Sequence, residues 1–532
     1  MAATINSIFF NDPSIGLLTF TATIFTAFLI TIVIVRNSKK RPTTVPLPGP
    51  WKLPVIGNLH QLAMNGGYSQ PHRRLSELAR QYGAADVMSL QLGELPHVVV
   101  STPEAARQVM KTHDLAFASR PAIFAPYILY GGGYNDIAFA PYGEHWRQLR
   151  KICTVELLSA KRVQSFRWIR EEEVAKLVVR LREAAVELGG RSKYADLLNN
   201  NNNNSDEGVD LSRMVGEMTG FVAARAAFGT IRGLNQALLT IVETISDVVA
   251  GFRISDLYPS LTFLPALTGF KGKLEKMHQE ADSILDAIIH ERKSQRQIDH
   301  KDYLIDVLLN FDPSQLRFPL TMKVIKAVIL EMLLGGNDTS SKIVEWTMSE
   351  LIKHPKVMQN VQDEVKQAFG EKGNVEEASL HQLKYLDCVI KETLRLHPPG
   401  PLLLPRENDE KMELCGYEIP AKTKLFVNAW AIGRDPRYWD KAEEFYPERF
   451  IGSSTDYKGN DFHFIPFGAG RRMCPGYDFG MEVVKLTLAN LLYHFRWELP
   501  GDLKPESLDM TECFGASVGR KYALRVIPVP VQ

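Results

Sequence analysis

The apolar and polar positions of the chain separate an uncharged N-terminal run from a long body of helical patterns. Residues 14–35 carry no charge and are numerous enough to cross the apolar core of a bilayer as a helix. Residues 1–13 contain no lysine or arginine, which argues against a cleaved signal peptide. Residues 36–41 are rich in both, which favours the cytosolic side for the body. We therefore expect a short lumenal N-terminus at 1–13 and a retained transmembrane anchor at 14–35.

Proline recurs after the anchor, from Pro46 to Pro54. Proline fixes φ and removes a backbone donor, so a helix cannot continue through this segment. We expect a basic, proline-rich stalk at 36–58 that orients a single catalytic domain at 59–532.

Strand alternation comes early in that domain, and helical periodicity follows. Residues 87–92 and 97–100 predict a hairpin that turns at Gly93 and Glu94. Residues 209–310 carry long helical patterns. The pattern predicts a mainly α fold with small β-sheets.

The segment 122–140 is apolar but contains Pro126 and three successive glycines, Gly131 to Gly133. These residues predict a loop. An apolar loop either packs into the core or surrounds an apolar ligand, and packing is the commoner case.

One long helix is expected from Thr321 to Glu350, apolar on most of its circumference between Val324 and Leu334 and therefore buried. Gly335 and Gly336 interrupt it. Each glycine costs about 1 kcal/mol in a helix interior, so we expect a local distortion there.

Composition excludes several classes of protein. The 532 residues include 62 basic and 61 acidic side chains, so no global charge favours nucleic acid, and 45% of the residues are hydrophobic. Five cysteines lie far apart without a C-x-x-C pair, which indicates neither a disulfide framework nor a zinc site.

Cys474 stands in a glycine-rich loop before a helical apolar pattern that runs from Phe479 to Leu492. Arg471 and Arg472 and the coming helix N-terminus favour the thiolate, the form of cysteine that binds metal. Gly476 and the neighbouring glycines permit backbone angles closed to other residues. The alternative is a small buried hydrophobe, the usual state of a lone intracellular cysteine.

The string F-x-x-G-x-R-x-C-x-G is met by Phe467, Gly470, Arg472, Cys474 and Gly476. It resembles the haem-binding loop of cytochrome P450 enzymes, and the resemblance extends over nearly the whole chain, closest to the plant A-type microsomal members. It implies the cytochrome P450 fold and haem b with Cys474 as the axial ligand of the iron.

The resemblance also assigns residues outside the loop. Trp146 and Arg150 match the W-x-x-x-R that holds a haem propionate. The resemblance implies Arg472 as a further propionate partner, and Arg406 as a candidate for the second propionate. Asp338 and Thr339, after the two glycines, match the oxygen-binding segment and imply proton delivery; Asn337 departs from the Thr or Ala of many relatives. A supporting set beneath the haem is implied for Glu392, Arg395 and Arg449.

By the same resemblance the substrate pocket draws on apolar segments. Its expected residues are Ile123, Phe124, Ile128, Leu334, Gly335, Leu402, Leu403, Phe514 and Ala516. They predict a small hydrophobic plant specialised metabolite, first a terpenoid and otherwise a phenylpropanoid or alkaloid.

No nucleotide-binding fingerprint appears, so electrons are expected from NADPH through the family's NADPH–cytochrome P450 reductase. The basic run around Arg147, Lys151 and Arg162 is a candidate docking face for that acidic partner. The implied protein is a monooxygenase that uses dioxygen, anchored by one helix in the endoplasmic reticulum membrane lipid. Two other classes stay open, a haem isomerase or dehydratase that uses no oxygen and a non-catalytic haem binder.

Overall fold

The computed structural model describes residues 46–531 except 65–66, 68, 199–207, 231–233, 250–251, 296–301, 371–372 and 502. The expected anchor at 14–35 lies outside the described residues. No helix within them combines the length and the apolar character needed to cross a membrane.

Helices make up most of the fold, as predicted. The longer ones are α4 (Pro71–Gln81), α6 (Phe124–Leu129), α7 (Glu144–Ile152), α8 (Ala160–Ser165), α9 (Arg167–Leu198), α10 (Leu211–Phe228), α11 (Leu234–Val249), α14 (Phe270–Gln295), α15 (Leu304–Leu309), α16 (Met322–Lys353), α17 (Pro355–Phe369), α18 (Lys384–Leu396) and α20 (Tyr477–His494). Short helices are α3 (Leu59–Ala63), α5 (Pro103–Arg107), α12 (Ile254–Leu257), α13 (Leu264–Leu267) and α19 (Ala429–Ile432).

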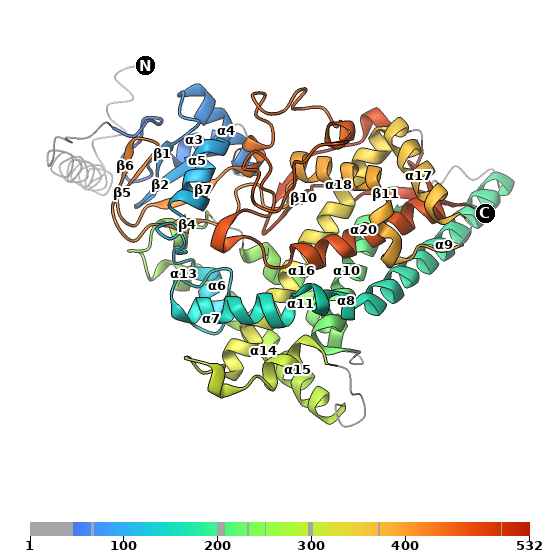
Figure 1. Cartoon of the computed structure of the whole chain (residues 1–532), viewed down its shortest axis with the longest axis horizontal. Helices are drawn as coiled ribbons and strands as arrows, with labels where there is room; N and C mark the ends of the chain where they lie inside the picture. Colours follow the sequence, from blue (N-terminus) through green and yellow to red (C-terminus); the bar gives the residue numbers. More distant parts are fainter. Residues whose placement is uncertain are drawn as a thin grey trace, which may run out of the picture.

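The strands form small sheets. They are β1 (Met88–Leu92), β2 (Leu95–Val100), β3 (Val209–Asp210), β4 (Arg406–Glu407), β5 (Met412–Leu414), β6 (Tyr417–Ile419), β7 (Lys424–Val427), β8 (Phe495–Glu498), β9 (Glu512–Phe514), β10 (Val518–Arg520) and β11 (Arg525–Pro530). The four-stranded sheet has the order β1-β2-β7-β4, with β2 parallel to β7. This sheet and the β5-β6 pair lie to one side of the helices, whereas β10 and β11 lie among the helices (Figure 1). The predicted hairpin is confirmed, since Leu92 pairs with Leu95 around Gly93 at φ +60°.

Residues 46–58, the described part of the expected stalk, lie against this sheet. The carbonyl oxygen of Pro48 accepts a hydrogen bond from the amide of Ser89 at 2.8 Å. The side-chain amide of Asn58 donates to the carbonyl oxygen of Trp51 at 2.9 Å. Pro48 is therefore tied to the sheet, and Asn58 to Trp51 within the same segment.

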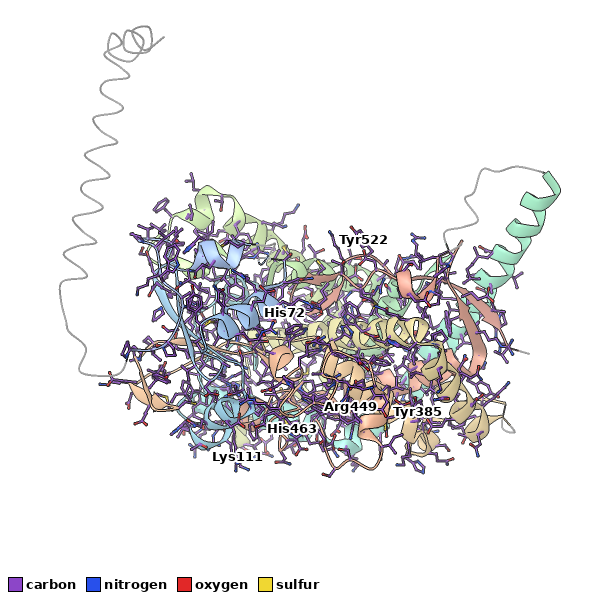
Figure 2. All side chains as sticks on the ribbon, turned by 90° about the horizontal axis from the view of Figure 1, so that it is seen from above. His72, Lys111, Tyr385, Arg449, His463 and Tyr522 are labelled. Carbon is purple, nitrogen blue, oxygen red and sulfur yellow. The ribbon has the colours of Figure 1, made fainter. Side chains whose placement is uncertain are left out.

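The loop that contains Glu448 and Arg449 is attached to α18 by a side-chain hydrogen bond. The hydroxyl of Tyr385, in α18, donates to Glu448 at 2.7 Å, and Figure 2 places Tyr385 beside Arg449. The chain around Arg449 thus packs onto α18, whose Glu392 and Arg395 become important below.

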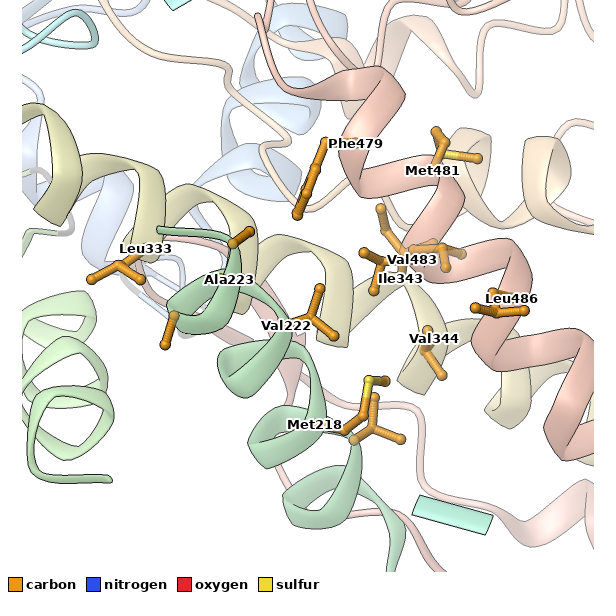
Figure 3. Packing of buried hydrophobic residues seen from close by; sticks show 14 of the residues in the cluster. Met218, Val222, Ala223, Leu333, Ile343, Val344, Phe479, Met481, Val483 and Leu486 are labelled. Carbon is orange, nitrogen blue, oxygen red and sulfur yellow. The ribbon is translucent and has the colours of Figure 1, made fainter. Parts of the chain in front are cut away.

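The centre of the core is α16, which packs against α10 and α20. Met218 and Val222 of α10 face Val344 of α16, and Val483 and Leu486 extend the same apolar layer on α20 (Figure 3). The helix is continuous from Met322 to Lys353, so the two glycines do not interrupt it. Packing on both flanks outweighs the low helix propensity of two residues.

Candidate active site

The cysteine loop places Cys474 at the wall of an internal cavity, directly before α20. Its amide donates to the carbonyl oxygen of Phe467 at 3.0 Å, and Gly476 caps the helix. Gly470 has φ +70°, and a Cβ there would lie 2.2 Å from the carbonyl oxygen of Met110. Only glycine fits that position. Gly476, by contrast, has an ordinary φ of −98°, so the expected unusual angle is wrong there.

The charges around the sulfur differ from expectation. Arg471 is turned toward Asp114, 3.5 Å away, and Arg472 donates to backbone carbonyls. Burial raises the pKa of the Cys474 thiol, while the amide of Gly476 and the charge of Arg150 lower it. Arg150 and the amide of Gly476 therefore oppose the effect of burial on the sulfur, whereas Arg471 and Arg472 are directed to other partners.

The cavity measures about 460 Å³ and is mostly apolar. Seven expected pocket residues line it, namely Ile123, Leu334, Gly335, Leu402, Leu403, Phe514 and Ala516. Phe124 and Ile128 are not among the residues that line it. They lie in the short helix α6, which the sequence predicted as loop, and pack away from the cavity, Phe124 against Phe270 at 6.2 Å between ring centroids.

Arg472, Arg150 and Arg406 all reach the cavity wall. Arg472 donates to the carbonyl oxygens of Ala118 and Ala140, each at 2.7 Å. Arg150 donates to Met473 at 2.6 Å, and Arg406 lies 3.4 Å from Asp114. Trp146 does not line the cavity. Its indole donates to Ile137 at 2.9 Å and its ring stacks on the Arg472 guanidinium at 4.1 Å, so it orients that arginine.

A fourth arginine, Arg120, was missed from the sequence. It is buried at the cavity wall, and its guanidinium donates to the carbonyl oxygens of Ala138 and Leu404 at 2.8 Å. Burial, Arg472 and Arg406 lower its pKa. Nothing local in the sequence marks it, because its partners lie far along the chain.

Two carboxyl groups, the buried Asp136 and the half-buried Glu331, interact with these arginines and were also missed. Glu331 of α16 accepts from the amide of Ile137 at 2.7 Å, and one carboxyl oxygen of Asp136 has no hydrogen-bond partner among the described residues. Burial raises the pKa of Asp136 to about 6, and burial and Asp136 raise that of Glu331. If one of these two carboxyl groups is protonated, the positive charge of the arginines exceeds the negative charge at this wall of the cavity.

This arrangement fits a haem. Four arginines, of which Arg150 is half-buried and the other three are buried, converge on one edge of an apolar cavity, where the two propionates of a haem would supply the missing negative charge. Cys474, in the same loop as Arg472, would supply an iron ligand, and Phe467 and Gly468 line the cavity beside it.

On α16, Asp338 and Thr339 line the same cavity. The hydroxyl of Thr339 donates to the carbonyl oxygen of Gly335 at 2.6 Å. The Asp338 carboxylate accepts from Ser246 of α11 at 3.1 Å and from Ser517 near β10 at 2.5 Å. Two other elements thus hold the Asp338 carboxylate at the cavity, whereas the Thr339 hydroxyl is bonded within α16.

Asn337 faces the other way. It is 5% exposed and its side-chain oxygen accepts from Thr219 of α10 at 2.7 Å. The helix turn that brings Asp338 to the cavity carries Asn337 into the α10–α16 interface, where it has no contact with the cavity.

The supporting set is assembled as a buried ion-pair network. Arg395 donates to both oxygens of Glu392, at 2.7 and 2.8 Å, and neither side chain is exposed. Arg449 donates to Glu392 at 3.1 Å. Arg395 also donates to the carbonyl oxygens of Gly433, Ala442 and Glu444. The stretch from Gly433 to Arg449 is therefore fixed to one side of α18.

Comparison with known proteins agrees with this site. The family model described as Cytochrome P450 matches residues 47–522. The chain is 45% identical to salviol synthase of Salvia pomifera over 94% of this chain and 96% of that protein. It is 43% identical to germacrene A hydroxylase of Saussurea costus over 96% and 99%.

Among solved structures, a zebrafish cytochrome P450 crystallised with abiraterone superposes with a TM-score of 0.68 at 24% identity, covering 87% of this chain and all of that one. This likeness shows the fold. The expected fold, haem cofactor and enzyme class are confirmed: the chain belongs to the cytochrome P450 family of haem-thiolate monooxygenases.

Proposed function

We propose that this protein is a membrane-anchored monooxygenase that oxidises a small hydrophobic plant metabolite, most simply a terpenoid, with electrons from NADPH delivered by a reductase. The observation that carries the proposal is that Cys474, Asp338 and Thr339 line one apolar cavity. A haem-binding protein without oxygen chemistry needs the cysteine alone.

The residues of the cavity have different roles in binding haem. Cys474 ligates the iron, and the amide of Gly476 hydrogen-bonds its sulfur and tunes its electron donation. Arg120, Arg150, Arg406 and Arg472 hold the propionates. The bound haem supplies the activation of dioxygen.

Asp338 and Thr339 supply protons to the oxygen side. The Thr339 hydroxyl, now bonded to Gly335, can turn to donate into the cavity. Asp338 is the nearest carboxylate on the same turn of α16, and its two serine partners keep it at the cavity wall. Thr339→Ala should lower the ratio of product formed to NADPH consumed; full coupling in that variant would favour an isomerase or dehydratase.

The substrate is inferred from the walls of the cavity. Apolar side chains such as Ile123, Leu334 and Phe514 exclude water and bind hydrocarbon. Germacrene A, on which one relative acts by its name, is a hydrocarbon of this kind.

Exposed apolar side chains support docking on a membrane. Trp51, Val55, Phe263 and Leu267 are 60–77% exposed, and the two segments that carry them meet where the hydroxyl of Tyr258 donates to Val55 at 3.4 Å. Such a group of residues next to the stalk suits contact with lipid.

The candidate docking face for the reductase lies on α7 and α8. Arg147 is half-exposed, although Glu144 pairs with it at 2.9 Å. Lys151 and Arg162 belong to the same surface run, and their charge suits an acidic partner. A partner docked there would contact α7, the helix whose Arg150 donates a hydrogen bond to Met473 in the cysteine loop.

Membranes that contain the full chain and the reductase test the proposal. Fed with a panel of terpenes, phenylpropanoids and alkaloids, they should consume NADPH and oxygen in a substrate-dependent way and form a product 16 mass units heavier, the mass of one oxygen atom. Absence of substrate-dependent NADPH consumption with every compound would favour a non-catalytic haem binder.

A further inference from the structure

The sheet that borders the cavity carries a lysine on its apolar face. Side chains alternate along β7, so Lys424 and Phe426 share one face while Leu425 and Val427 take the other. Phe426 packs with Leu402 and Leu257 on the face that borders the cavity. Lys424 lines the cavity and is only 7% exposed, in a position where an apolar side chain is expected.

The ammonium of Lys424 uses few of its donors. It has three N–H groups, and among the residues that the structure describes its one hydrogen bond goes to the carbonyl oxygen of Asp256, at 3.1 Å. No ion pair forms with any described carboxylate. Burial lowers the pKa of Lys424, and the charges of Asp256 and Glu407 offset only part of that effect, although neither carboxylate is in contact with the ammonium.

The neighbouring polar groups are engaged elsewhere. The carboxylate of Asp256 accepts from the amide of Phe124 at 2.7 Å, and that of Glu407, on β4, lies 3.5 Å from the exposed Lys422. His97, the β2 partner of Lys424, donates its Nδ1–H to Leu95 at 2.9 Å. Burial and the charge of Lys424 lower the pKa of His97 to about 3, so its ring is neutral.

We propose that Lys424 binds the carboxylate of a substrate whose apolar body fills the cavity between the sheet and the cysteine loop. The proposal rests on the proposed function and names its substrate class as an apolar carboxylic acid. A carboxylate would accept the two unused N–H donors and neutralise the buried charge, which a hydrocarbon cannot do.

The geometry also explains how such a substrate would be oriented. Lys424 stands in the four-stranded sheet, with Phe252 and Phe426 stacked beside it at 5.2 Å between ring centroids. Cys474, Asp338 and Thr339 line the same cavity from other elements. Holding the acid group at the sheet would direct the hydrocarbon part toward the reacting centre.

The test compares a matched pair of ligands, farnesoic acid and its methyl ester. Their dissociation constants would be measured by calorimetry with the haem-loaded full chain in nanodiscs, before any turnover. The native protein should bind the acid about 10-fold more tightly than the ester, as expected for a hydrogen-bonded charge. Lys424→Met should reduce that ratio to about 1 through loss of acid binding alone.

A matched control is Lys276→Met, whose side chain is 78% exposed on α14. This variant should keep the native acid-to-ester ratio. Equal binding of acid and ester by the native protein, or an equal loss of both in Lys424→Met, would overturn the proposal and leave Lys424 as a structural tie to Asp256. A failure of the monooxygenase assignment would appear separately, as absent product formation from any compound.

Discussion

Removal of Arg395 offers a severe test of the network under the haem site. Arg395→Met keeps the length of the side chain and deletes its charge. The variant loses five hydrogen bonds, two to Glu392 and three to carbonyl oxygens. Glu392 stays fully buried and keeps Arg449 and the amide of Tyr446 as partners.

The magnitude follows from burial. Breaking a buried ion pair by removing one partner costs about 3–5 kcal/mol, because the remaining charge cannot return to water. The residual partners of Glu392 place Arg395→Met near the lower end of that range. Arg449→Met should cost about 1–3 kcal/mol, since Arg449 makes one contact with Glu392 and two with carbonyl oxygens near the surface.

The assay is urea unfolding, followed by the loss of haem absorbance and of helical circular dichroism. Arg437→Met is the matched control, because Arg437 pairs with Asp435 but is 56% exposed, and it should change the free energy of unfolding by less than about 1 kcal/mol. If Arg395→Met folds and loses no more free energy of unfolding than Arg437→Met, the network is not a structural lock.

Four further outcomes are expected. Cys474→Ser should abolish the thiolate-type carbon monoxide spectrum, and a variant that kept it would exclude Cys474 as the iron ligand. Gly470→Ala should lower the haem content, because the new Cβ would clash with the carbonyl oxygen of Met110. The control Gly452→Ala, at φ +68° with open space around it, should not lower it. Equal haem content in the two variants would show that the loop tolerates the Cβ at residue 470. Asn337→Ala should cost about 1 kcal/mol of stability and leave the ratio of product to NADPH unchanged, and reduced coupling would place Asn337 in proton delivery. Burial raises the pKa of Glu350, but hydrogen bonds from His354 and His397 outweigh it and lower that pKa from 4.5 to about 2. The ionised Glu350 therefore stabilises the fold above pH 4.5, and this stabilisation is lost as the pH falls toward 2. Glu350→Gln should make the urea midpoint less dependent on pH between 4.5 and 2, and an unchanged pH profile would contradict a stabilising role of the ionised Glu350.

Short-range patterns in the sequence were sufficient for the family and for the chemistry of single residues. The cysteine loop and the Asp338–Thr339 pair are motifs of adjacent residues, and each lies at the cavity as a unit. The helix around Val324 and the early hairpin follow from periodicity alone. Here local backbone preference and tertiary packing agree.

Expectations that depended on the direction of a side chain were less secure. Phe124 and Ile128 are apolar residues of the expected segment, yet one short helix turns both away from the cavity. Asn337 is adjacent to Asp338 but lies 100° around the helix, a rotation that decides which of them meets the cavity. The apolar composition of a segment does not show which of its side chains face the cavity and which face away from it.

The sequence by itself determined the family, the iron ligand and the helical class, because these depend on residues at fixed spacing. Only the tertiary structure decided which charges meet. Arg120 joins Arg472 at one wall, and Lys424 meets Asp256 and His97 at another, across separations of more than a hundred residues. Burial then sets the energy of each charge, and burial belongs to the whole fold and not to any local stretch of the chain.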